Sequence, residues 1–159
     1  MNRRILAVPL LALTVGGLAL AVPTLNLSLM KVTSVTTNGV KSETLSSAEK
    51  VTPGDTLLQR ATLKTDKALK GGHIVLPVPK NTRYLSGTAS TFKDLSLDYS
   101  ADGKTFSAQP MKTVTVTENG KTVSKQVPVP ENEYTALRWT IITLPKDAVV
   151  TVSYRVSVN

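Results

Sequence analysis

The chain has 159 residues, of which 41% are hydrophobic and 19% charged, with a formal net charge of +8 and no cysteine. This length supports one compact domain and is too short for a multidomain enzyme. The lack of cysteine excludes disulfides, thiolate metal sites and cysteine nucleophiles, and the single histidine, His73, excludes multi-histidine metal sites.

The first 21 residues have the pattern of a secretory signal peptide. A positive start, Arg3-Arg4, precedes an apolar run over 5–20, and a small-x-small cleavage site ends at Ala21. We therefore predict export to the periplasm, cell surface or medium, and a mature domain of residues 22–159. Loss of the two arginines lowers its net charge from +8 to +6. The alternative is a retained anchor, because the run extended to Val22 reaches the lower limit for spanning a bilayer.

Apolar and polar residues then alternate, which predicts β-strands with one buried face. The alternation begins at Leu25, Leu27 and Leu29 and returns over 74–78, 95–99, 137–141 and 150–158. Turn signals with Gly, Pro, Asn or Asp separate these runs. We predict a single all-β, antiparallel β-sandwich of about seven to ten strands. The side chains expected in its core are Leu57, Ala61, Leu63, Ile74, Leu76, Val78, Leu97, Leu137, Trp139, Ile141, Val152, Tyr154 and Val156.

Residues that could take part in catalysis or in metal or sugar binding are interpreted as structural. Asp98 to Gly103 resembles the first half of a calcium loop, but Gln109 stands where the bidentate carboxylate belongs, so we expect a hairpin turn from which Phe106 returns to the core. His73 is out of phase with the next strand's apolar residues and is expected on the outer face. Trp139 is expected in the core and not as a sugar platform. We predict no enzyme, no metal site and no cofactor.

The clearest hairpin spans 113–127, with Asn119-Gly120 at a turn that requires positive φ angles. Its apolar face is expected to consist of Val114, Val116, Val123 and Val127. Its other face is expected to be exposed to solvent. Pro128 and Pro130 predict an extended edge or linker after it.

An isolated two-stranded ribbon is marginally stable in water, so this hairpin is expected to fold back on the sandwich or to pair with a partner. The candidate interface residues are Thr113, Thr115, Thr117, Asn119, Gly120, Lys121 and Lys125.

Three further segments, at 51–56 (Val-Thr-Pro-Gly-Asp-Thr), 76–87 and 144–152, occur in a characteristic order. In that order they resemble the bacterial surface-repeat family catalogued as domain of unknown function 11, over residues 49–158. Asp147 stands where that family usually has Gly, Thr65-Asp66-Lys67 stands for its Asn-x-Gly turn, and the 113–127 hairpin looks like an insertion. The resemblance implies an immunoglobulin-like fold on secreted and envelope proteins, with no catalytic residues to carry over.

We therefore expect a non-catalytic structural or assembly module, with envelope or surface proteins as partners, self-association included. The alternative is a basic module that binds a polyanion such as extracellular DNA or acidic polysaccharide. Because its lysines are scattered, such binding is expected to be weak. A small hydrolase or metalloenzyme is disfavoured by the residue inventory.

Overall fold

The structure, a computed structural model, describes residues 23–118 and 120–159. The predicted signal peptide and the turn residue Asn119 lie outside these residues. In the part described, no helix has the length and apolar character needed to cross a membrane.

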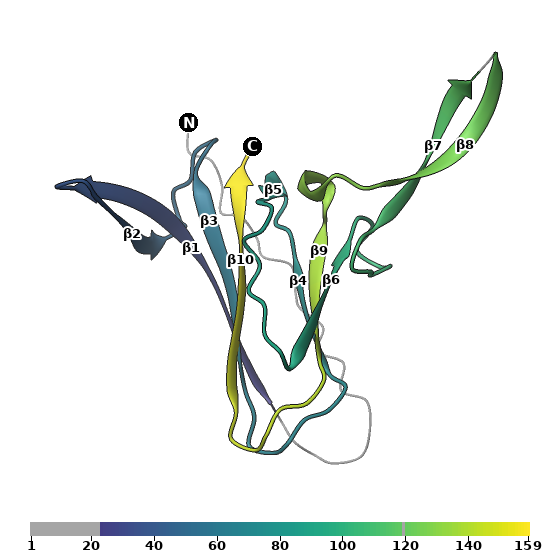
Figure 1. The fold of residues 1–159 in the computed structure, drawn as a ribbon. Coiled ribbons are helices and arrows are strands. Elements are labelled where there is room, and N and C mark those ends of the chain that lie inside the picture. The colour runs from purple at the N-terminus through teal and green to yellow at the C-terminus, as the bar shows by residue number, and fades with distance from the viewer. Residues whose placement is uncertain (1–22, 119) are drawn as a thin grey trace.

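Ten strands form three antiparallel sheets in the described part of the chain (Figure 1). The larger sheet, in the order β2-β1-β3-β10-β5, consists of β1 (Thr24–Thr37), β2 (Val40–Ser47), β3 (Thr56–Lys64), β10 (Val149–Val158) and β5 (Thr82–Tyr84). The smaller sheet, in the order β4-β9-β6, consists of β4 (His73–Pro77), β9 (Ala136–Ile141) and β6 (Leu95–Ser100). A separate hairpin of β7 (Met111–Glu118) and β8 (Lys121–Pro128) precedes a 3-10 turn, η1 (Glu131–Glu133). The predicted all-β antiparallel sandwich with an extra hairpin is confirmed.

The two larger sheets enclose one apolar core. Every residue predicted to face this core is buried except Val78 and Leu97, which pack against it half-buried. Trp139 has no exposed surface, and its indole Nε1 donates to the carbonyl of Ser90 at 2.9 Å. Its expected place in the core is confirmed, because alternation along β9 directs it inward.

Val129 lies in the segment predicted as an extended edge or linker. It is 4% exposed and belongs to the core, a burial that the sequence analysis did not predict, and its N–H donates to the carbonyl of Pro110 at 2.9 Å. One local prediction is wrong. Phe106 does not return to the core. Its ring lies 4.6 Å from the guanidinium carbon of Arg138, which alternates with buried residues and so points to the outer face of β9. A cation over an aromatic ring replaces the expected core contact.

The turn before β3 is closed by one carboxylate. Asp55 Oδ2 accepts hydrogen bonds from Lys31 Nζ on β1 and from the N–H of Thr52, each at 2.7 Å. These bonds, that of Lys31 first, hold the pKa of the Asp55 carboxyl below its ordinary value. Asp55 thus ties the start of β3 to β1.

Candidate functional site

The hairpin of β7 and β8 projects from the sandwich as a two-stranded arm, hereafter the β7–β8 arm (Figure 1). Neither of its strands pairs with another strand in the described residues. Met111 pairs with Pro128 at the base, so the arm is longer than the predicted 113–127. At the outer end Glu118 lies opposite Lys121, and Gly120 has a φ of +76°, as the predicted two-residue turn requires.

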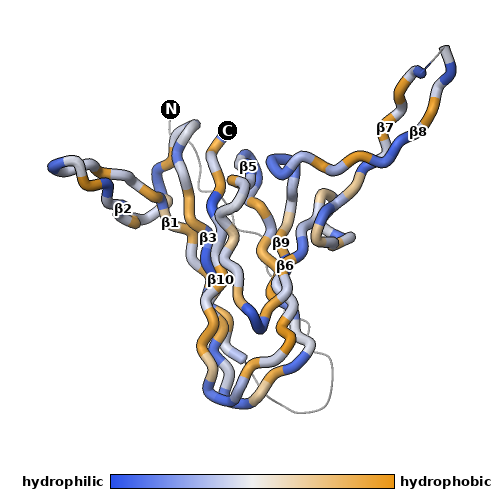
Figure 2. Tube along the Cα trace, viewed as in Figure 1, coloured by the Kyte–Doolittle hydropathy of each residue, from blue (hydrophilic) through white to orange (hydrophobic). Residues whose placement is uncertain are grey.

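The two faces of the arm differ in chemistry (Figure 2). Val114 and Val116 alternate with threonines along β7, whereas Val123 and Val127 of β8 share their face with Lys121 and Lys125. One face carries the four half-buried valines predicted from the sequence, Val114, Val116, Val123 and Val127. The other face carries three exposed threonines, Thr113, Thr115 and Thr117, and Gln126 Nε2 donates to Thr113 Oγ1 at 2.7 Å. The face that carries the four valines is called the valine face below.

The structure divides the residues nominated as an interface between these faces. The three threonines lie on the polar face. Lys121 and Lys125 belong to the valine face by register, and Lys125 forms an ion pair with Glu118. Gly120 lies at the turn, and Asn119 lies outside the described residues. Lys121 therefore lies at the outer end of the arm, whereas Lys125 lies opposite Val114, between Val123 and Val127 on the same face.

A hollow of about 250 Å³ lies where the arm leaves the sandwich. The turn after β6, the base of the arm and η1 contribute its walls, including Asp102, Met111 and Val129. Lys112 Nζ on β7 and Glu133 on η1 form an ion pair at 2.7 Å beside it, which fixes the base of the arm. Among the residues described, no group of three His, Cys, Asp or Glu side chains is placed to hold a metal ion.

The segment that resembled half a calcium loop is a turn closed by its own side chain. Asp102 Oδ1 accepts bonds from the N–H groups of Thr105 at 2.7 Å and Lys104 at 2.8 Å, and from Ser100 Oγ at 2.9 Å. These bonds, that of Thr105 first, hold the pKa of Asp102 far below its ordinary value. Asp98 instead pairs with Arg138 at 2.8 Å on the outer face. The two carboxylates serve separate structural contacts.

All four tyrosines of the chain gather between the sheets. Tyr84 lies with ring centroids 5.9 Å from Tyr99 and from Tyr154, and 6.0 Å from Tyr134. Burial is the main cause that raises the pKa values of Tyr99, Tyr134 and Tyr154. These three phenols stay protonated at neutral pH, and the four rings pack against one another between the sheets. Sequence reasoning missed it, because only the fold brings residues so far apart in the chain together.

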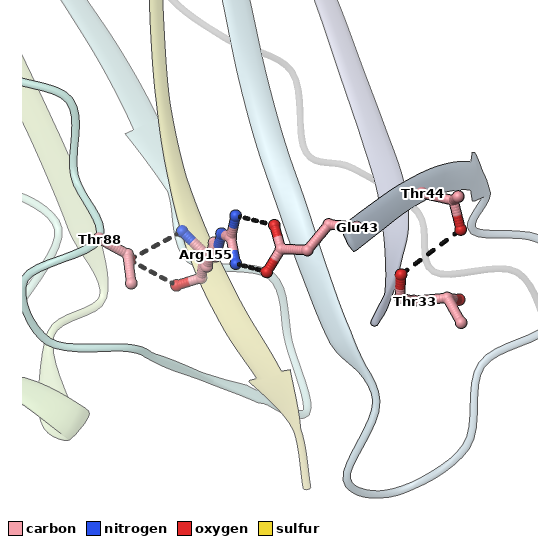
Figure 3. A network of polar contacts seen from close by, with 5 residues as sticks. All are labelled: Thr33, Glu43, Thr44, Thr88 and Arg155. Atoms are coloured by element: carbon pink, nitrogen blue, oxygen red, sulfur yellow. Dashed lines mark hydrogen bonds and ion pairs between the residues drawn. The ribbon is translucent and has the colours of Figure 1, made fainter. Parts of the chain in front are cut away.

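A second hairpin, β1–β2, projects on the other side of the molecule (Figure 1). Its turn, Asn38-Gly39, has φ angles of +51° and +77°. Figure 3 shows Arg155 of β10 reaching Glu43 of β2 through two parallel hydrogen bonds, of 2.9 and 2.6 Å. Thr88 accepts the N–H of Arg155 at 3.0 Å. This hairpin is thereby tied back to the larger sheet, whereas the ion pair of Lys112 with Glu133 ties the β7–β8 arm to the sandwich at its base.

His73 lies on the outer face of β4 as predicted, with Nδ1 3.0 Å from Thr140 Oγ1 of β9. The arrangement is that of a sandwich with two projecting hairpins. No family model, curated protein or solved structure matches this chain.

Proposed function

We propose that this chain is a non-catalytic, exported module of the bacterial cell envelope or surface that assembles with other proteins through the β7–β8 arm. The observation that carries the proposal is the valine face of the arm, which no strand covers in the described residues. A two-stranded ribbon is marginal in water, and a partner that buries its apolar face stabilises it. Backbone groups along its unpaired edges offer such a partner a β-ladder without special side chains.

Features of the sequence support the envelope assignment. The basic start, apolar run and cleavage pattern before Val22 favour export. The resemblance to the surface-repeat family gains support at Asp147, whose φ of +60° is the left-handed conformation that favours the Gly usual there. Thr65 Oγ1 bonds the carbonyl and the N–H of Lys67, which gives a side-chain-stabilised turn in place of Asn-x-Gly.

Export is tested by N-terminal sequencing of the protein recovered from cells that express the full chain. We expect a terminus at Val22, because the small-x-small pattern ends at Ala21. An intact Met1 in the membrane fraction contradicts cleavage and supports the anchor.

The role of the arm is tested by replacing residues 113–127 with a short Gly-Ser linker. We expect the sandwich to stay folded, because the buried Val129 at the base and all other core residues are retained. Co-purification with envelope components should be lost. A matched control, Thr115→Ser with Ser124→Thr, changes only the polar face and should retain it. If the linker variant is folded and still assembles normally, the arm is not the interface and the proposal fails.

A second candidate function, polyanion binding, has its own support at the foot of the sandwich, the end away from the arms (Figure 2). The backbone bonds between Leu69 and Leu144 join two connections there, over 65–72 and 142–148. Lys70 and Lys146 lie on these connections with exposed side chains. Lys146 Nζ also lies 4.0 Å from Asp147 Oδ2. With Lys67, and against Asp66 and Asp147, the two connections carry a net charge of +1, which gives extracellular DNA or an acidic polysaccharide a weak local attraction.

A further inference from the structure

The inward face of β1 is incompletely covered. Leu25, Leu27 and Leu29 lie opposite Leu63, Ala61 and Gln59 of β3 in the β1–β3 register. Because directly opposed residues share a face of a sheet, the three leucines point toward the core side. Leu27 is nevertheless 41% exposed, and Leu25 and Leu29 are only half-buried. The larger sheet has five strands and the smaller one three, so the larger sheet extends beyond its cover.

The smaller sheet ends above these leucines with an unpaired edge. Tyr84 of β5 contacts Tyr99 of β6, while the Tyr154 hydroxyl of β10 meets both Gln59 of β3 and the carbonyl of Pro77 in β4. The two sheets therefore pack face to face, with β6 over β5 and β4 over β10 and β3. A strand added beyond β4 would lie over β1.

Hydrogen bonding along β4 shows what its outer edge offers. Val78 N–H donates to Thr135 and Ile141 N–H donates to Gly72, so even-numbered residues of this segment bond β9. In an antiparallel ladder the alternate residues direct their N–H and C=O groups the other way. His73 and Val75 thus present both groups outward, where no strand of the described chain pairs with them. The first part of β1, before Met30, likewise pairs with β3 alone among the described strands.

The β7–β8 arm has the matching properties. Val114 and Val116 of β7 recur at every second residue, as the three leucines do. Two added strands would bring the smaller sheet to five, the number in the larger sheet. The threonines of the arm's polar face would then continue an outer surface that is already polar, with His73 bonded to Thr140.

The β7–β8 arm cannot pair with the free edge of β4 in its own molecule. It leaves the sandwich beside the turn that follows β6, where Asp102 and Met111 line one hollow, and β6 and β4 are opposite edges of the smaller sheet. Figure 1 shows the arm directed away from the sandwich. Donor and acceptor therefore lie on opposite sides of one molecule, which is the geometry of a heterologous contact that repeats without closing.

We propose that the β7–β8 arm of one copy adds to the free edge of β4 in a second copy and covers its three leucines with the valine face, so that copies join head to tail. This inference rests on the proposed function and narrows its partner to a second copy of the chain.

The chain has no cysteine, so single thiols can test the contact. We expect that mixing a Leu27→Cys copy with a Val116→Cys copy under mild oxidation gives a disulfide-linked dimer, whereas neither copy crosslinks alone. A chain carrying both substitutions should give a ladder of multimers. Replacing Val116→Cys by Thr115→Cys, on the opposite face of the same strand, should abolish the crosslink. Circular dichroism of each variant confirms that it is folded.

Other results overturn the inference in distinguishable ways. Self-crosslinking of Val116→Cys means that two arms pair with each other. Crosslinks from Val116→Cys only to other envelope proteins leave the proposed function standing and remove the second copy as partner. Resistance of Leu27→Cys to a thiol reagent in dilute monomer means that the chain itself covers the leucines. The proposed function fails separately, if the linker variant at 113–127 still assembles.

Discussion

At the scale of single residues, Tyr154 makes the most consequential polar contacts in the core. Its hydroxyl lies 2.7 Å from the carbonyl of Pro77 and 2.8 Å from Oε1 of Gln59. A hydroxyl has one proton, so the Tyr154 hydroxyl shares it between two acceptors, the carbonyl of Pro77 and Oε1 of Gln59. This network joins β10, β3 and β4, and thus the two sheets.

Tyr154→Phe should therefore cost about 1 to 3 kcal/mol in the free energy of unfolding, because it leaves buried groups without partners. Urea denaturation followed by fluorescence measures the loss. Tyr84→Phe is the matched control, since the Tyr84 hydroxyl is buried and no described group meets hydrogen-bond geometry with it. Equal losses in the two variants would show that the hydrogen bonds of the Tyr154 hydroxyl add nothing beyond the effect of removing a buried hydroxyl.

Asp55 gives a prediction in pH. Its lowered pKa means that its carboxylate stabilises the fold above the ordinary value of 3.8, and that this stabilisation is lost as pH falls through the folded-state pKa. Asp55→Asn should lower the unfolding free energy at pH 7 by about 1 kcal/mol or less, because the ion pair with Lys31 is partly solvated. The gap should narrow below about pH 4. Denaturation curves at several pH values measure it, with the exposed Glu49→Gln as control. A gap independent of pH contradicts the ion pair.

At the scale of elements, the alternation of apolar and polar residues predicted the strands that have one buried face. It did not predict a strand that is exposed on both faces. The strands around Ile74, Leu97 and Trp139 were found because every second residue faces the core. Strand β2 is exposed throughout and offers no such contrast, although Asn38-Gly39 signals its turn as plainly as Asn119-Gly120 signals the other. Local turn chemistry is visible in sequence, but a hairpin without a buried face has little else to mark it.

Some features of the candidate site could be predicted from the sequence and others could not. The valine face of the β7–β8 arm follows from the spacing of four residues within one hairpin, and it was predicted. The open edge of β4 and the uncovered Leu27 depend on which strands become neighbours and how many each sheet contains. Those are non-local properties, which no spacing within one segment reports. The burial of Val129 was not predicted for a related reason, since the other members of its core cluster come from distant elements.

At the scale of the whole molecule, the distribution of charge sets the strength expected of polyanion binding, the second proposed function. The sequence is basic by +8, and +6 without the predicted signal peptide, but its lysines are spread over both hairpins and the foot. Several cations are engaged by carboxylates, as in the pairs of Lys112 with Glu133 and Arg155 with Glu43. A polyanion would therefore meet few phosphates or carboxylates at once, and its affinity would come from local charge alone.

Binding of heparin or duplex DNA should accordingly be weak and should vanish at about 0.3 M salt, where the screening length falls to several Å. Lys70→Gln with Lys146→Gln, at the foot of the sandwich, should weaken this binding, because both side chains are exposed there. Lys104→Gln, on the turn after β6, is the matched control and should have little effect. Fluorescence anisotropy over a salt series measures both. Affinity that survives high salt or depends on base sequence would contradict the dominance of the assembly role, since scattered charges supply neither property, and would favour the polyanion-binding module.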